Sequence, residues 1–218
     1  MTRILWRRVN VVGAVIICVG LAVLAARAGD EAESLLKQLE KKYDTINDAT
    51  VVFSQHVLYG VTKAEQSFTG RFIMRKGNKY RIELEDQTIV TDGKSVWSFA
   101  KSTNQVIIDK YKEDPRSFSP DKVLVNVPQH YHAIVLGKEK IHDEETTILK
   151  MVPIDPKSNM QWMKVWIDED RLMKRIQVLD ISDNLWTYGI DSIKTNTGVS
   201  DSRFQFTPPT GVGVVDLR

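Results

Sequence analysis

The chain has almost no cysteine and few signs of catalysis. Cys18 is its one cysteine among 218 residues, and it lies in an apolar segment near the amino terminus. An intrachain disulfide is therefore excluded, and a hydrophobic core must hold the fold together. Neither a phosphate-binding glycine loop, a dinucleotide fingerprint nor a Gly-x-Ser-x-Gly stretch occurs. No catalytic residue is predicted, and the protein is not expected to be an enzyme.

The chain also lacks a strong excess of charge of either sign. It holds 30 basic and 28 acidic residues, but four arginines and no acidic residue fall in the first 28 positions. The remainder therefore has 26 basic and 28 acidic residues, a formal charge of −2. Because the basic excess belongs to the amino-terminal segment, no nucleic-acid partner is indicated.

One long hydrophobic run is present, from Val9 to Ala26, and three arginines precede it. The run ends in Ala26-Arg27-Ala28, a small-x-small site. This pattern predicts a secretory signal peptide over residues 1–28, cleaved after Ala28, and a single domain over residues 29–218. About eighteen apolar residues is also the lower limit for crossing a bilayer, so an uncleaved anchor is the alternative.

Hydrophobic periodicity predicts one helix followed by many strands. Between Asp30 and Ile46 the apolar residues fall three or four apart, which indicates an amphipathic helix that covers another element; they are Leu35, Leu36, Leu39, Tyr43 and Ile46. Alternating runs then follow at 51–58, 68–75, 79–84, 88–100, 106–109, 146–152, 161–168, 172–181 and 185–193. Turn pairs separate them: Gly77-Asn78, Asp92-Gly93, Asp155-Pro156, Glu169-Asp170 and Asp183-Asn184. The arrangement predicts an antiparallel meander.

Two segments interrupt this rhythm. Residues 114–134 contain three prolines, and Ser119-Pro120-Asp121 is a capping signal for a short helix through Val127, which we predict to be a second covering element. The stretch Phe204–Pro209 is predicted to be a short strand that stops at two prolines.

His130 and His132 could form a metal pair on a strand, but no third ligand lies near them, and we interpret them as surface residues.

The large aromatic residues are the feature of the sequence that is most informative about function. Trp97 and Phe99 follow the Asp92-Gly93 turn at positions that share one strand face, and we expect both to point inward. Other large apolar residues alternate on the neighbouring strands; they include Phe72, Met74, Tyr80 and Ile82. Such a set can form an ordinary core or line a cavity for an apolar ligand, and the sequence does not separate the two.

The order of landmarks resembles one known family. Behind the signal segment and the helix come Phe53-Ser54-Gln55, Gly70-Arg71-Phe72 and Thr91-Asp92-Gly93-Lys94-Ser95-Val96-Trp97. The last of these landmarks is Phe204-Gln205-Phe206-Thr207-Pro208-Pro209-Thr210-Gly211-Val212. Over essentially the whole length after residue 28, this closely resembles the periplasmic outer-membrane lipoprotein carrier family, LolA.

The resemblance implies a mainly β fold with helices: an incomplete antiparallel barrel closed by the amino-terminal helix and a short middle helical lid. Its apolar cavity would bind acyl chains in the periplasm without a cofactor or metal. The implied partners are acylated lipoproteins, an inner-membrane ABC transporter complex and an outer-membrane receptor, and the implied state is a monomer. Residues expected to line the cavity are Leu39, Tyr43, Phe72, Met74, Tyr80, Ile82, Trp97 and Phe99.

One departure from the family concerns lid control. Members of the well-known type carry Arg-Pro after the Gly-x-Φ-x-Φ strand, and the arginine helps control opening of the lid. Here the matching stretch is Arg75-Lys76-Gly77, so Lys76 is the expected gating residue. A lysine cannot reproduce the planar bidentate contact of an arginine.

The sequence leaves three other functions as alternatives. An envelope-stress sensor on the same scaffold usually carries a second domain, for which 190 residues leave little space. A membrane-tethered receptor would need a lipobox cysteine, but bulky Ile17 precedes Cys18. A hydrolase with an apolar pocket would need a nucleophile and a base that the sequence does not show.

Overall fold

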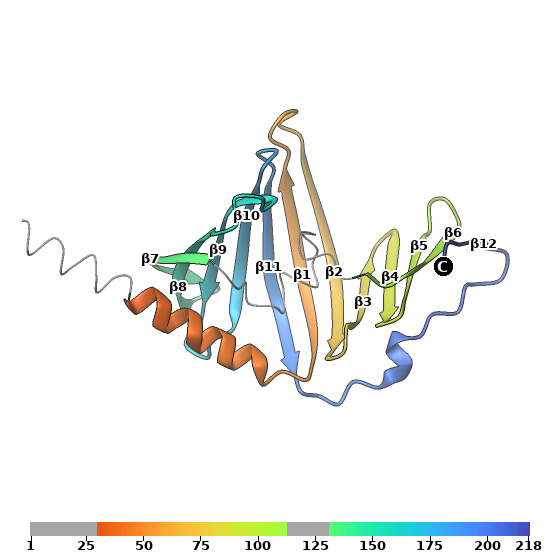
Figure 1. Cartoon of the computed structure of the whole chain (residues 1–218), viewed down its shortest axis with the longest axis horizontal. Coiled ribbons are helices and arrows are strands. Elements are labelled where there is room, and N and C mark those ends of the chain that lie inside the picture. Colours follow the sequence, from red (N-terminus) through yellow and green to blue (C-terminus); the bar gives the residue numbers. More distant parts are fainter. Residues whose placement is uncertain (1–29, 113–130) are drawn as a thin grey trace, which may run out of the picture.

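A computed structural model describes residues 30–112 and 131–218 (Figure 1). A helix over residues 30–44 precedes the strands. The strands in the first half are β1 (Asp48–Leu58), β2 (Glu65–Arg75), β3 (Lys79–Leu84), β4 (Gln87–Asp92), β5 (Ser95–Ala100) and β6 (Gln105–Lys110). The second half holds β7 (Tyr131–Ile141), β8 (Glu144–Pro153), β9 (Met160–Ile167), β10 (Met173–Asp180), β11 (Leu185–Thr195), the 3₁₀ helix η1 (Asp201–Phe204) and β12 (Gly213–Asp216). In these two ranges, no helix has the length and apolarity needed to span a membrane.

All twelve described strands belong to one open sheet. Their order is β12-β6-β5-β4-β3-β2-β1-β11-β10-β9-β8-β7, and every pair is antiparallel except β12 with β6. The predicted antiparallel meander is confirmed, with β7 and β12 at the two edges. Four of the five predicted turn pairs lie in connections between consecutive strands, and the fifth, Asp92-Gly93, begins with the last residue of β4.

The hairpin between β4 and β5 shows why the turn chemistry works. Asp92 accepts hydrogen bonds from the backbone N–H groups of Lys94 and Ser95, both at 2.8 Å, and so closes the turn. Gly93 has a φ of +88°, and a Cβ there would come within 2.6 Å of the Gly77 carbonyl oxygen. Only glycine fits this position without strain or a clash.

Three segments differ from the predictions or lie outside the described range. Strand β7 begins at Tyr131, inside the stretch predicted to be a covering element, and the sequence did not predict it. The rest of that element, His130 and the predicted signal peptide lie outside the described residues. The predicted strand at Phe204–Pro209 is wrong: Phe204 ends η1, the next residues have no strand, and β12 follows at Gly213. Two prolines without backbone N–H groups prevent strand pairing there.

The amino-terminal helix lies across the β7–β11 half of the sheet and leads into β1 (Figure 1). As the periodicity predicted, Leu39, Tyr43 and Ile46 are buried, and Leu35 and Leu36 are half-buried against the same core. The strands contribute most of this core; its strand residues include Val51, Phe53, Phe72, Leu149, Met151, Met163, Val165, Ile176, Val178 and Tyr188. We call the sheet surface under the helix the inner face and the opposite surface the outer face.

Candidate functional site

The inner face continues as an apolar surface into the β2–β6 half of the sheet. Strand register places Phe72 beside Val51 and Ile82, and Ile82 beside Ile89. A second row pairs Met74 with Tyr80. Phe72 and Ile82 are buried, whereas Met74, Tyr80, Leu84 and Ile89 are half-buried beside the core. Four of the predicted cavity residues therefore lie together on one surface.

The row that contains Phe72 and Ile82 continues to the edge of this half. Ile89 pairs with Ser98, Ser98 with Ile107, and Ile107 with Val215 of β12. Ile107 is 41% exposed and Val215 is 38% exposed. The inner face thus changes from a sealed core beneath the helix to an accessible apolar surface near β6. An accessible surface of this kind can bind an apolar chain without any charged ligand residue.

Leu39 and Tyr43 lie on the helix, above the other half of the inner face. The Tyr43 hydroxyl accepts a hydrogen bond from the backbone N–H of Met173, the first residue of β10, at 3.1 Å. Burial raises the pKa of Tyr43, so the phenol stays neutral and keeps this contact at physiological pH. A second link joins the Arg171 guanidinium to the Gln38 side chain at 2.8 Å. These two contacts fasten the helix to the β9–β10 region.

Lys76 contacts the other end of the same helix. Its ammonium nitrogen donates to the backbone carbonyl oxygen of Asp44 at 2.6 Å, and its backbone N–H donates to the Asn47 carbonyl at 2.9 Å. The Lys76 side chain is exposed to solvent. The predicted gating residue thus touches the element that it was expected to control, although through one carbonyl instead of a bidentate contact.

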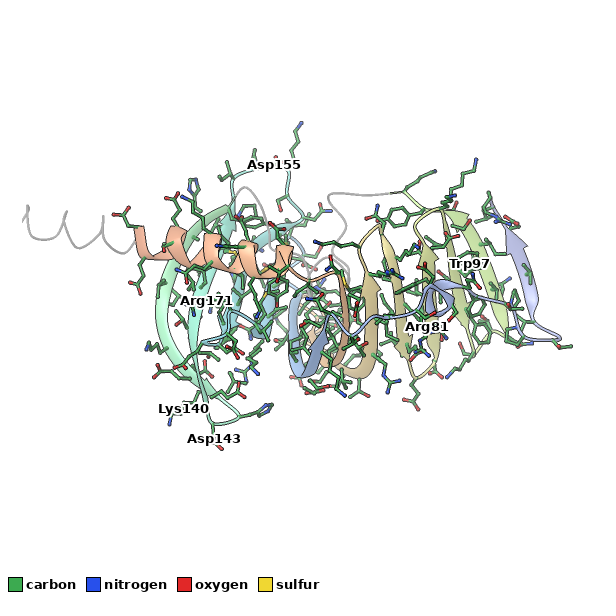
Figure 2. The ribbon with its side chains drawn as sticks, turned by 90° about the horizontal axis from the view of Figure 1, so that it is seen from below. Arg81, Trp97, Lys140, Asp143, Asp155 and Arg171 are labelled. Carbon is green, nitrogen blue, oxygen red and sulfur yellow. The ribbon has the colours of Figure 1, made fainter. Side chains whose placement is uncertain are left out.

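Trp97 and Phe99 lie on the outer face, which corrects the expectation that they point inward with the other six residues. Trp97 pairs with Val90, Val90 with Arg81, and Arg81 with Ile73. Since directly paired residues share a face, this row is one position out of phase with Phe72 and Ile82. Figure 2 shows Arg81 and Trp97 in the half of the sheet that the carboxy-terminal segment crosses. The hairpin pattern predicted that the two side chains share one face of the strand, but it did not indicate which face of the sheet that is.

The carboxy-terminal segment covers part of this outer surface, including Phe99. η1 packs on β3 and β4, and Phe204 is only 1% exposed. The rings of Phe99 and Phe206 lie 6.0 Å apart at a tilt of 40°. Asp201 forms ion pairs with Lys79 at 2.7 Å and Arg75 at 3.2 Å. A second, smaller core therefore lies on the outer face, and its sequence signal was the Phe-x-Phe pair that we had predicted to be a strand.

The described residues offer no metal centre. Within residues 30–112 and 131–218 no group of three or more His, Cys, Asp or Glu side chains could hold a metal ion. His132 is exposed on β7. The methionines are distributed unevenly: Met151 and Met163 are buried, and Met74 is half-buried on the accessible part of the inner face. Its unbranched side chain suits a surface that must adapt to its ligand.

Comparison with known proteins identifies the family. The family model described as outer membrane lipoprotein carrier protein LolA matches residues 44–207. The chain belongs to the LolA family. An outer-membrane lipoprotein carrier protein of Histophilus somni is 25% identical over 187 residues, which cover 84% of this chain and 88% of that protein.

Two further proteins that are similar to this LolA-family chain are described as uncharacterized. An uncharacterized protein of Methanocaldococcus jannaschii is 26% identical over 185 residues; the chain spans 52% of its length, and the match covers 83% of this chain. The crystal structure of an uncharacterized conserved protein from Thermus thermophilus superposes with a TM-score of 0.55 at 14% identity, covering 84% of this chain and 98% of that one. That likeness shows a shared fold.

Proposed function

We propose that this protein is a carrier in the bacterial periplasm that binds the acyl chains of lipoproteins on its inner face and transfers them from the inner to the outer membrane. The observation that supports this most directly is the accessible apolar surface of β2–β6, from half-buried Met74 and Tyr80 to Ile107. Family membership supports the same cargo class. The protein acts by binding and release and not by catalysis.

The energetics suit such a task. An acyl chain in water costs about 0.8 kcal/mol for each exposed CH₂ group, so a long chain gains much from any apolar cover. Binding by apolar contact needs no fixed charge, which agrees with the aliphatic, aromatic and methionine side chains on the inner face of β2, β3 and β4. Thr91, Ser98 and Asp109 share this face toward β6. The helix over residues 30–44 would act as a lid over the bound chain, with Lys76 at its end controlling release.

A matched pair of variants tests the site. Ile107 and Val214 lie on adjacent strands and are 41% and 50% exposed, but Val214 pairs with Val106 on the outer face. Ile107→Glu places a charge on the proposed acyl surface and should weaken displacement of a fluorescent fatty-acid probe. Val214→Glu should leave it unchanged. Equal behaviour of the two variants would contradict the assignment of the inner face.

Identification of the natural cargo tests the carrier role itself. The protein purified from an envelope extract should retain triacylated lipoproteins, detectable by mass spectrometry of the bound fraction. It should pass them to outer-membrane acceptors in a transfer assay. A sensor on the same scaffold would bind the acylated molecule but fail to transfer it.

A further inference from the structure

Three hairpin tips lie at the same end of the sheet. They are residues 59–64 between β1 and β2, 154–159 between β8 and β9, and 181–184 between β10 and β11. Leu58 pairs with Leu185, and Asp180 pairs with Met160, so the three connections leave the sheet on one side. The β1–β2 and β10–β11 tips stand next to each other at the top of Figure 1. We call the three tips together the hairpin rim.

Each tip of the hairpin rim exposes one branched aliphatic side chain. Val61 is 88% exposed, Ile181 is 63% exposed and Ile154 is 53% exposed. Turns of this kind favour glycine, proline and short polar residues, and a single exposed aliphatic residue is common. Here all three connections at one end of the sheet carry such a residue at the tip. Packing does not require this pattern, because these side chains add little to the core.

The tips are fixed relative to one another. The Gly60 backbone N–H donates to the Asn184 side-chain oxygen at 3.0 Å, and the Ile181 N–H donates to the Asn159 carbonyl at 3.1 Å. A Cβ on Gly60 would lie 2.5 Å from the Asp183 carbonyl oxygen, so glycine permits the close approach of the first two tips. The rim is thus a connected surface that presents its aliphatic residues together.

Several polar groups of the tips are paired within the chain. Asp180 accepts hydrogen bonds from the N–H groups of Ser182 and Asn184 at 2.8 and 2.9 Å. Asp155 accepts from the Lys157 N–H at 2.8 Å. A backbone group that leaves water without a partner costs several kcal/mol in hydrocarbon. Tips with internally paired groups can therefore enter a lipid headgroup region at a lower cost.

Basic and aromatic side chains accompany the aliphatic ones. Lys157 and Lys63 lie on the tips themselves. Below them on the sheet, the ammonium groups of Lys164 and Lys150 lie 4.9 and 5.8 Å from the centre of the Trp162 ring. These four lysines form no ion pair with any side chain in the described ranges. Carboxylates also occur here, but Asp155 and Asp180 are engaged by turn N–H groups, and Asp183 accepts from the Gln161 amide at 2.7 Å.

We propose that the hairpin rim docks on the surface of a lipid bilayer. Val61, Ile154 and Ile181 would enter the boundary between headgroups and acyl chains, and the lysines would contact anionic headgroups. Exposed aliphatic residues beside a tryptophan and unpaired lysines match the composition of surfaces that bind at this boundary. The proposal concerns the protein's position at a membrane and does not depend on what the inner face binds.

Site-specific fluorescence tests the proposal with the full chain. Cys18→Ser removes the one native cysteine, and Val61→Cys, Ile181→Cys or Leu217→Cys is then labelled with an environment-sensitive dye. Leu217 is 59% exposed and follows β12 at the far edge of the sheet, so it is the control. Vesicles of phosphatidylethanolamine and phosphatidylglycerol should shift the emission to the blue at positions 61 and 181 but not at 217. Unchanged emission at 61 and 181, or an equal shift at 217, would overturn the proposal.

Vesicle flotation gives a second readout. Val61→Ser with Ile181→Ser should lower the partition coefficient about 10-fold, because two aliphatic groups no longer leave water. Leu217→Ser should change nothing, and the amino-terminal segment is the same in every variant. All variants should still displace a fluorescent fatty-acid probe, so a failure of rim docking is distinct from a failure of acyl binding. If the double variant floats with the vesicles as well as the wild type, or if the dye responds only to a protein partner, the hairpin rim does not bind a bilayer.

Discussion

The Lys76 ammonium donates a 2.6 Å hydrogen bond to the Asp44 carbonyl oxygen, in the last turn of the amino-terminal helix. The final carbonyls of a helix have no partner within the helix, and the negative end of the helix dipole lies there. A cation at this position therefore stabilises the helix end in two ways: it donates a hydrogen bond to a free carbonyl, and it interacts favourably with the helix dipole. The contact also ties the helix to the residue that follows β2, which belongs to the half of the sheet with the accessible inner face.

Lys76→Ala should loosen the helix end without unfolding the protein. Because the contact is exposed, we expect a stability loss of about 0.5–1 kcal/mol. Amide exchange in residues 40–46 should become faster, and the association rate of an acyl probe should rise. Lys101→Ala is the matched control, since Lys101 donates to the Glu85 carbonyl at 2.5 Å far from the helix. If both variants exchange and bind alike, Lys76 has no gating role.

Tyr43→Phe should destabilise the protein by about 1–3 kcal/mol, because it leaves the buried N–H of Met173 without its acceptor. The ring itself still fills the same space. Tyr59→Phe is the control: its hydroxyl donates to Gln66 at 2.9 Å in an exposed position, where water can replace the lost partner. Urea unfolding measures both variants, and equal losses would show that the Met173 contact does not fasten the helix.

The sequence predicted the helix and most strands because these elements are governed by local periodicity. Leu39, Tyr43 and Ile46 recur at helical spacing, and all three are buried. The turn pairs fix where strands end, so the meander follows. Strand β7 escaped prediction because it lies directly after the proline-containing stretch, and we assigned its first residues to that stretch.

Which face a strand presents to the core was harder to predict. Alternation shows that Trp97 and Phe99 share a face, but both faces of β5 are half-buried, so hydrophobicity does not distinguish them. The register across β3, β4 and β5 decides the question, and it depends on pairing between segments. The cover on the outer face comes from Phe204 and Phe206, more than 100 positions later in the chain. Single-strand patterns contain no information on such a contact.

Asp48 should make the protein sensitive to acid. Burial acts to raise the pKa of this carboxyl, but hydrogen bonds from the N–H groups of Thr197 and Gly198, at 2.8 and 3.0 Å, outweigh it and hold the pKa below its usual range. A lowered pKa in the folded state stabilises the fold above about pH 4, the pKa of the unfolded group, and this contribution disappears as the pH falls through the folded pKa.

Asp48→Asn should therefore cost about 1–2 kcal/mol at pH 7 and progressively less toward pH 3. Urea titrations at several pH values measure the difference from the wild type. Asp216→Asn is the control: Arg218 lowers the pKa of Asp216 to about 2, but the group is exposed and its pairing should not affect stability. A constant difference for Asp48→Asn across this pH range would show that its ionisation is not coupled to folding.

The second core should behave as a coupled unit. Phe99 and Phe206 are in ring contact at 6.0 Å, so a double-mutant cycle with Phe99→Leu and Phe206→Leu should give a coupling energy of about 0.5–1.5 kcal/mol. A cycle that pairs Phe206→Leu with Ile176→Val, on β10 and in the inner-face core, should give additive losses. Additivity in both cycles would mean that the Phe99 and Phe206 rings do not stabilise each other beyond their separate burial.

Tryptophan emission should distinguish the two faces of the sheet when ligand binds. Trp186 is half-buried against the inner-face core, and its indole donates to Asp180 at 3.0 Å, whereas Trp97 lies on the outer face beside Val90 and Ile108. Two variants each retain one of these residues, with the other four tryptophans replaced by phenylalanine. A fatty-acyl ligand on the inner face should shift the emission of the Trp186 variant, because movement of the helical lid would change the packing of the core against which this indole lies. The Trp97 variant should not respond, since η1 and Phe206 cover its side of the sheet. A shift in the Trp97 variant alone, with binding shown independently, would place the acyl chain on the outer face and reverse the assignment of the site.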